Sequence, residues 1–251
     1  MVKKLRIISY NICALPKWFN IYGNPLKRIS KIIDILDSID ADIICLQELF
    51  DRKIIEIVKQ SMIKYNFFYK KSTSKLFLNS GLMILSKYTI INSGYETFSN
   101  HCGEDSLATK GIIFSNIIFN NKIITIINTH LNADSIFSTK YRCRNIRLKQ
   151  IGQIINNIKK THHTNNIILC GDLNMIYSHN THFLNKLKNS YKYCICSNNT
   201  LPKLITHRKN KTQIDYIYYL YNEQQHIEYK YDTYISEQSD HNAIILEIIF
   251  M

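Results

Sequence analysis

Six short polar motifs follow one another along this chain, and each is the kind of segment that ends a buried strand with a ligand for a metal ion or a phosphate group. They are Ile8–Asn11, Leu46–Glu48, Asn128–Leu131, Gly171–Asn174, Ile214–Tyr216 and Ser239–His241. Most of them adjoin apolar runs, as the ends of buried strands do. One such motif alone is weak evidence, because Asp and Asn are common in loops. Six in this order predict that their carboxylate, amide and imidazole groups collect in one active site.

The first two motifs offer oxygen ligands. Glu48 closes an apolar run, and we expect it to bind a hard cation such as Mg²⁺, which prefers oxygen ligands and keeps several waters. Asn11 ends the first expected strand and could bind the same ion, or a water on it, through its amide oxygen. The alternative for Glu48 is a charge at the start of the following helix, and the alternative for Asn11 is a turn.

The later motifs offer groups for proton transfer and phosphate binding. Asp172 could orient or deprotonate water and Asn174 could donate to a phosphate oxygen, although an Asx turn explains the same motif. His241 suits a general base because the unperturbed pKa of histidine, about 6.5, lies near physiological pH. His130 could donate to the phosphate or to the leaving oxygen, although a histidine after an apolar strand is more often part of the core.

The elements that must position these motifs are short strands rich in β-branched residues, with helices between them. The expected strands are Leu5–Asn11, Ile43–Gln47, Leu82–Ser86, Ile112–Ile118, Ile123–Thr129, Ile167–Cys170, Ile214–Tyr219 and Ile244–Ile249, and the expected helices are Leu26–Ser38, Arg52–Lys64 and Tyr141–Lys159. The segments around Asn120–Asn121 read as a hairpin. Many strands with a few helices between them predict α/β layers with antiparallel pairing.

Composition narrows the class of protein. The chain has 251 residues with only seven glycines and three prolines, and we expect one domain over residues 1–251. Seven scattered cysteines favour reduced thiols in an intracellular protein. No apolar run suits a membrane span or a signal peptide, so we expect a cytoplasmic or peripheral membrane protein. The net charge of +13 predicts attraction to nucleic acid, acidic membrane or polyphosphate, although A/T-rich coding would produce a similar composition.

The ordered motifs resemble those of the endonuclease/exonuclease/phosphatase superfamily of metal-dependent phosphodiesterases, from about Leu5 to Ile249. The resemblance implies a DNase I-like four-layer α/β/β/α sandwich of two packed mixed sheets. It implies Mg²⁺ as the cofactor, with Mn²⁺ as the alternative. It also implies that Asp215 fixes the tautomer of His241 and that Asp240 supports the metal ion.

One segment is similar to a particular branch of that superfamily. Asn100–Gly111 looks like the segment that neutral and bacterial sphingomyelinases carry before their central hairpin, with matching Cys102, Gly103, Asp105, Lys110 and Gly111. The stretches 48–51 and 128–134 resemble the same branch. The similarity implies that Asp105 and Lys110 shape the substrate site. The alternative is an exposed ion pair in a loop.

The resemblance departs from the bacterial enzymes near the C-terminus. Those enzymes insert a long apolar hairpin that docks on membrane, whereas Tyr216–Ser239 leaves little room for one. Trp18 and Phe19, in the segment Pro16–Tyr22, could dip into a membrane interface instead, because aromatic side chains favour that boundary. The alternative is that these aromatic rings cap the core beneath a loop.

We therefore expect a Mg²⁺-dependent, sphingomyelinase-like phosphodiesterase that releases phosphocholine from sphingomyelin or a related phospholipid and leaves ceramide or its equivalent. The alternative is a Mg²⁺-dependent endonuclease or exonuclease acting on DNA or RNA. An inositol-phosphate phosphatase ranks lower, because no segment like the WCDR of those enzymes occurs at Ile214–Tyr216. A catalytically silent relative ranks last, because every catalytic position that we identify is filled. Oligomeric state is left open.

Overall fold

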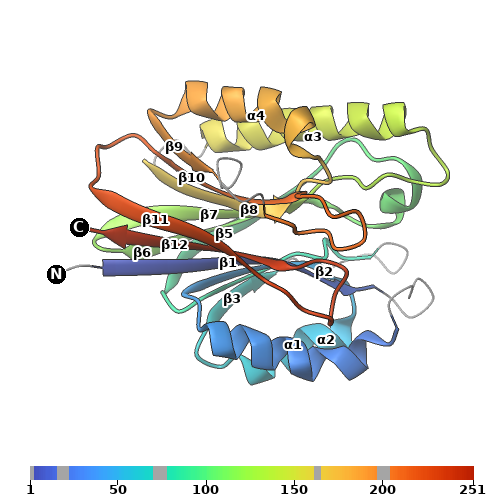
Figure 1. Cartoon of the computed structure of the whole chain (residues 1–251), viewed down its shortest axis with the longest axis horizontal. Helices are drawn as coiled ribbons and strands as arrows, with labels where there is room; N and C mark the ends of the chain where they lie inside the picture. The colour runs from blue at the N-terminus through green and yellow to red at the C-terminus, as the bar shows by residue number, and fades with distance from the viewer. Residues whose placement is uncertain (1–2, 16–22, 70–77, 161–164, 197–203) are drawn as a thin grey trace.

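The structure is a computed structural model of the chain, and it describes residues 3–15, 23–69, 78–160, 165–196 and 204–251. Two six-stranded sheets pack against each other, and helices cover the outer face of each sheet (Figure 1). The expected four-layer α/β/β/α sandwich of mixed sheets is therefore confirmed.

The first sheet has the strand order β11-β12-β1-β2-β4-β3. Its strands are β1 (Lys3–Ala14), β2 (Ile43–Leu49), β3 (Asn66–Tyr69), β4 (Met83–Ser86), β11 (Ile227–Tyr234) and β12 (Ala243–Phe250), and its covering helices are α1 (Pro25–Ile39) and α2 (Arg52–Ser61). Helix α1 begins where the side chain of Asn24 accepts a hydrogen bond from the backbone N–H of Leu26, with Pro25 in the first turn, as N-capping favours.

The second sheet has the order β5-β6-β7-β8-β10-β9. Its strands are β5 (Ile90–Thr97), β6 (Gly111–Phe119), β7 (Lys122–His130), β8 (Asn166–Asp172), β9 (Tyr193–Cys196) and β10 (Asp215–Tyr221). Helices α3 (Lys140–Lys160) and α4 (Tyr177–Ser190) cover it, and the short 3₁₀ helix η2 (Gly103–Leu107) precedes β6. The central strands β7 and β8 pair in parallel, and the other neighbouring strands of this sheet pair antiparallel.

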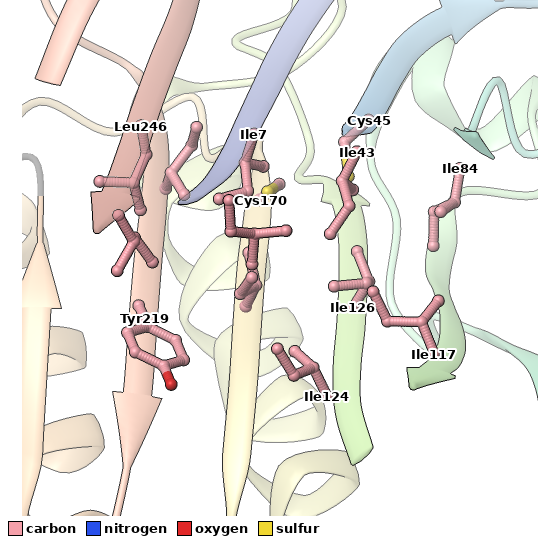
Figure 2. Packing of buried hydrophobic residues seen from close by; sticks show 14 of the residues in the cluster. Ile7, Ile43, Cys45, Ile84, Ile117, Ile124, Ile126, Cys170, Tyr219 and Leu246 are labelled. Carbon is pink, nitrogen blue, oxygen red and sulfur yellow. The ribbon is translucent and has the colours of Figure 1, made fainter. Parts of the chain in front are cut away.

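Apolar side chains alternate between the two faces of each strand and so fill three layers of core. In β1, Leu5 and Ile7 enter the layer between the sheets, while Ile8 and Tyr10 pack beneath α1. Figure 2 shows the layer between the sheets, where Ile7 lies near Cys170. Complete burial of one such aliphatic side chain contributes about 1.5–3 kcal/mol, so this layer holds the two sheets together.

The topology brings the ends of the central strands to one edge of the sandwich. Strands β1 and β2 run parallel to each other, as do β7 and β8, so all four end at the side away from the chain termini (Figure 1). Strand β12 pairs antiparallel with β1, and β10 pairs antiparallel with β8, so both begin at that same side. The polar motifs therefore meet there.

The strongly apolar strands and the helices α1 to α3 lie where the sequence predicted them. Strands β3, β5, β9 and β11 and helix α4 were not predicted. Strand β11 lies at a sheet edge and is mostly exposed, so its sequence IEYKYDTY lacks an apolar run. Helix α4 is largely polar, which hides the helical period in its sequence.

Gly171 allows β7 and β8 to approach closely at this edge. Its φ is +153°, and a Cβ atom built there would lie 2.1 Å from the backbone oxygen of Thr129. The two strands that carry His130 and Asp172 would have to separate to accept a side chain.

We predict that Gly171→Ala lowers the free energy of unfolding by about 1–3 kcal/mol, the usual range for overpacking a well-packed site. Denaturant-induced unfolding followed by circular dichroism measures the change. Gly152→Ala is the matched control, because a Cβ atom there meets nothing within 4 Å in helix α3. Alanine should stabilise that helix position by about 0.5–1 kcal/mol. Equal stability of the two variants would contradict the close-approach argument.

Candidate active site

The edge described above gathers side chains from both sheets. Asn11, Glu48 and His241 come from β1, β2 and the loop before β12, whereas His130, Asp172 and Asp215 come from β7, β8 and β10. Nearly all of these side chains are buried. Four carboxylates lie at this edge: those of Asp172 and Asp215 are buried, and those of Glu48 and Asp240 are half-buried. The sequence predicted this convergence.

The backbone of β2 is distorted at Glu48. Its φ is +58°, in the left-handed region, and the pairing of β1 with β2 shifts register just there. A non-glycine residue in this region costs of order 1–3 kcal/mol, and bulges of this kind re-aim side chains near active sites. The alternative role for Glu48 at the start of α2 is not observed, because Asp51 accepts a hydrogen bond from Lys53 as the N-cap of that helix.

Asn11 joins two of the carboxylates. Its Nδ2 donates to Glu48 Oε1 at 3.0 Å and to Asp172 Oδ2 at 3.1 Å. Its Oδ1 accepts from the backbone N–H of Cys13 at 3.1 Å, which fixes the orientation of the amide. The amide nitrogen thus faces the cluster, whereas the expected metal ligand was the amide oxygen. In this arrangement Asn11 spaces the two carboxylates, and its role as a ligand stays a prediction.

His241 and Asp215 form the shortest histidine–carboxylate contact described at the site. The Nδ1 of His241 lies 2.8 Å from Asp215 Oδ2, and its Nε2 lies 3.7 Å from Asp172 Oδ2. Thr206 Oγ1 accepts from the backbone N–H groups of Ile214 and Asp215 and holds the start of β10. The family resemblance implied the contact between His241 and Asp215, and the structure contains it. The carboxylate fixes the ring orientation and leaves Nε2 facing the cluster.

Burial and like charge change the pKa values of these groups. Burial and the neighbouring charge of Asp215 raise the pKa of Asp172 to about 7. Burial also raises the pKa of Glu48. For His241, burial opposes the charged ring, but the charge and hydrogen bond of Asp215 outweigh it and raise the pKa to about 10. The carboxylates of Asp172 and Glu48 are therefore poorly stabilised as anions by the protein alone.

His130 is held as a neutral ring. Burial, followed by the charge of Lys110, lowers its pKa well below the ordinary value. Its Nε2 lies 3.0 Å from Asn174 Nδ2 and 3.3 Å from Lys110 Nζ, both of which are donors. Nε2 must therefore accept, and the ring proton sits on Nδ1. Donation from His130 to a phosphate would require these contacts to change, so that role stays a prediction.

Asp172 and Asn174 form the Asx turn that was the alternative for their motif, and their side chains also lie at the site. Asp172 Oδ1 accepts from the backbone N–H of Asn174 at 2.8 Å, which is an Asx turn. The amide of Asn174 also donates to the carbonyl oxygen of Leu131 at 3.0 Å. The turn therefore sets the Asn174 side chain against the end of β7, beside His130.

Lys110 and Asp105 form a pair that is buried rather than exposed. Lys110 is 2% exposed, and its Nζ lies 2.8 Å from Asp105 Oδ1 and 3.2 Å from the carbonyl oxygen of Leu131. Asp105 also accepts from the backbone N–H of Ala133 at 2.7 Å. The alternative of an exposed loop ion pair is wrong. A buried ammonium group against His130 supports the expectation that this pair shapes the site.

Three other residues at the site were not predicted. The ring of His207 lies 5.1 Å from that of His241, edge to face, and His207 can reach the same point as Asp240 and His241. Arg208 donates to the carbonyl oxygens of Ser236 and Ser239, and Arg28 donates to that of Gln238. No short motif marks these residues, because they approach the site from separate loops and helices.

A cavity of about 540 Å³ opens beside His130. Its lining includes the polar side chains of Glu48, Lys110 and His130 and the apolar side chains of Leu15, Phe50, Leu78, Leu107, Ala108, Ile136 and Phe137. Glu104, Asp105 and Asp134 complete the lining together with Ala133. The site thus continues into a pocket that has both polar and apolar walls.

The candidate membrane-contact residues Trp18 and Phe19 lie outside the described residues. Within the described part of the chain, no helix is both long enough and apolar enough to cross a bilayer.

The donor set of the cluster fits a divalent cation. The carboxylates of Asp172 and Asp215 are buried together, and Asp215 Oδ1 is buried without a hydrogen-bond partner among the described residues. One triad of Asp172, Asp215 and His241, and another of His207, Asp240 and His241, could each converge on one ion. A hard cation prefers such oxygen-rich surroundings and would relieve the repulsion that raises the pKa of Asp172.

Comparison with known proteins agrees with this geometry. The chain is 25% identical over 194 residues to sphingomyelinase C of Bacillus cereus, and the alignment covers 68% of this chain. It covers 57% of the Bacillus protein, so the chain matches a little over half of that relative's length.

Solved structures share the fold. The crystal structure of SmcL superposes with a TM-score of 0.83 at 20% identity and covers 99% of each chain. A beta toxin mutant from Staphylococcus aureus with bound magnesium ions gives a TM-score of 0.75 at 20% identity, covering 97% of this chain and 99% of that one.

The family model described as the endonuclease/exonuclease/phosphatase family matches residues 18–241, a span that contains all six polar motifs except the first. The expected superfamily and its sphingomyelinase-like branch are both confirmed. This match, together with a site built at the ends of the central strands, shows that the chain belongs to the endonuclease/exonuclease/phosphatase family.

Proposed function

We propose that this protein is a divalent-cation-dependent phosphodiesterase that hydrolyses sphingomyelin or a related choline phospholipid, releasing phosphocholine and leaving ceramide or its equivalent. The observation that carries the proposal is the His241–Asp215 contact of 2.8 Å, with Asp172 facing the opposite ring nitrogen. The sequence similarity to sphingomyelinase C supports the choice of substrate.

Each side chain has a part in the hydrolysis. Asp172 Oδ2 lies 3.7 Å from His241 Nε2, so both can act on one water molecule. His241 accepts a proton from that water as its oxygen attacks phosphorus, and the bond from phosphorus to the ceramide oxygen breaks. The ceramide oxygen takes up a proton from solvent water as it leaves, and the imidazolium of His241 then returns its proton to solvent. Asp215 stabilises the imidazolium that forms. Lys110 stabilises negative charge nearby from a fixed position.

Glu48 and Asp240 are the residues that we propose to hold the cation, with Mg²⁺ first and Mn²⁺ as the alternative. The ion would neutralise charge on the phosphate and on the carboxylates. Such neutralisation lowers the pKa of His241 from its high value, because the charges of Asp215, Asp172 and Asp240 are what keep the ring protonated. The ring is then free to act as a base.

The cavity favours a lipid over a nucleic acid. Among the described residues that line it, Lys110 is the lone cationic side chain, and Lys110 already pairs with Asp105. A nucleic-acid groove needs lysine and arginine side chains along the phosphate backbone, with aromatic rings for the bases. An apolar wall beside carboxylates suits instead a substrate with a hydrocarbon part and a cationic head group. A nuclease remains the alternative, favoured by the net charge of +13.

We predict that His241→Ala lowers turnover about 10²–10⁴-fold, the usual contribution of a general base, while the protein stays folded. Release of phosphocholine from sphingomyelin vesicles measures the loss, and circular dichroism checks folding. His179→Ala, in an exposed position on α4, is the control and should keep full activity. A plasmid-nicking assay with the same preparations separates the two substrates. Nicking without phosphocholine release would replace the lipid proposal by the nuclease.

Glu48→Gln should weaken the binding of Mg²⁺, because the substitution removes a negative charge and keeps the shape of the side chain. We expect the Mg²⁺ concentration for half-maximal activity to rise by at least about tenfold, which corresponds to about 1.4 kcal/mol. Glu56→Gln, on the exposed face of α2, is the matched control. An unchanged Mg²⁺ titration would remove Glu48 from the metal site.

Binding of Mg²⁺ should release protons near neutral pH. Asp172, with a pKa of about 7, is about half protonated at pH 7, and His241, with a pKa of about 10, is protonated. A cation favours the deprotonated form of both groups, so Mg²⁺ affinity should rise as the pH rises from 6 to 8. Titration calorimetry in two buffers of different ionisation enthalpy counts the protons. Affinity that is independent of pH would show that neither group faces the ion.

A further inference from the structure

Three large apolar side chains that line the cavity are also exposed to solvent. Ile136 is 87% exposed, Phe137 is 77% exposed and Leu107 is about half exposed, and all three line the cavity. We call them the apolar rim. Single exposed apolar residues are ordinary, but a group of them around one opening marks a surface that meets an apolar partner.

The loop between β7 and α3 carries two members of the apolar rim, Ile136 and Phe137, and it is held firmly at its base. Asp105 Oδ2 accepts from the backbone N–H of Ala133 at 2.7 Å, and Asp134 forms an ion pair with Arg147 at 2.9 Å. Ser135 Oγ accepts from the backbone N–H of Phe137 at 3.0 Å, which sets the turn at the tip. The apolar side chains are thus kept outward by a fixed frame, although burying them would be favourable.

Basic side chains follow directly after the rim. Helix α3 begins at Lys140 and has no acidic residue in its first turn. Its first three turns expose Lys140, Arg142, Arg144 and Lys149, and Tyr141 between them is 76% exposed. Two of the carboxylates at the cavity mouth are already paired, Asp105 with Lys110 and Asp134 with Arg147. The net character of this surface is apolar at the tip and cationic beside it.

We propose that the apolar rim and the basic start of α3 together form the surface by which this protein docks on a lipid bilayer that contains anionic phospholipid. Apolar side chains flanked by lysine and arginine are the pattern by which a protein lies on such a membrane. The apolar rim lines the same cavity as Lys110 and His130. Docking there would place a phospholipid head group at the cavity mouth. The choice of a bilayer as occupant rests on the proposed function.

The test is sedimentation with vesicles of phosphatidylcholine and phosphatidylserine, carried out in the His241→Ala background so that no lipid is consumed. The change Ile136→Ser together with Phe137→Ser should lower the partition coefficient by at least about tenfold. Ile63→Ser is the matched control, because Ile63 is 85% exposed and lies in the loop between α2 and β3. The control should bind vesicles as the parent protein does.

Three outcomes would overturn the proposal. They are no vesicle binding by the parent protein, equal binding by the rim variant, and an equal loss in the Ile63→Ser control. Binding that is lost on replacing Arg142 and Lys149 by serine, yet kept without the rim, would also overturn it and point to a polyanion such as nucleic acid.

The proposed function is tested separately, by release of phosphocholine from a water-soluble phosphocholine ester by the protein with His241 intact. Absence of that release together with rim-dependent vesicle binding would refute the proposed substrate and leave the docking surface standing.

Discussion

The structure depends on one electrostatic constraint, the burial of several carboxylates at one edge of the sandwich. Asp172 and Asp215 face each other across antiparallel strands, and Glu48 lies across from Asp172 through the amide of Asn11. Burying like charges costs free energy unless a counter-charge is present. Within the described residues, His241 and Lys110 supply positive charge, while burial and the charge of Asp215 still raise the pKa of Asp172 to about 7. The positively charged side chains at the site therefore compensate the carboxylates only in part.

This constraint explains the backbone around the site. Positive φ values occur at Cys13, Glu48 and Asn174, each beside a motif residue or at one. Such conformations persist only where the surrounding structure imposes them. The packed layer between the sheets and the parallel strand pairs enforce these backbone conformations, because they fix where β1, β2 and β8 end.

Sequence reasoning could locate the central strands and the ordered motifs, because both depend on local patterns. Strands β2 and β8 are buried on both faces, so their apolar runs can be recognised in the sequence. Edge strands such as β11 are half polar and have no such run. Contacts between distant segments are a different matter. The contact of His207 with His241 depends on a loop path that no local pattern encodes.

Atomic roles were harder still to predict than positions. The motif that contains Asn11 predicted an amide at the site, but only the backbone N–H of Cys13 decides which end of that amide faces inward. Likewise, the tautomer of His130 follows from the two donors that surround its Nε2. Lys110 could be expected near the substrate by resemblance, yet its burial depends on Asp105 and on the carbonyl oxygen of Leu131.

The loop that carries His241 is already ordered in the folded protein. Arg208 and Arg28 bind the carbonyl oxygens of Ser236, Ser239 and Gln238, so the loop is fastened by the protein's own backbone. The loss of freedom for this segment is therefore met during folding and not when a ligand arrives. Under the proposed function, binding energy from the substrate is left available for strain and charge stabilisation at phosphorus.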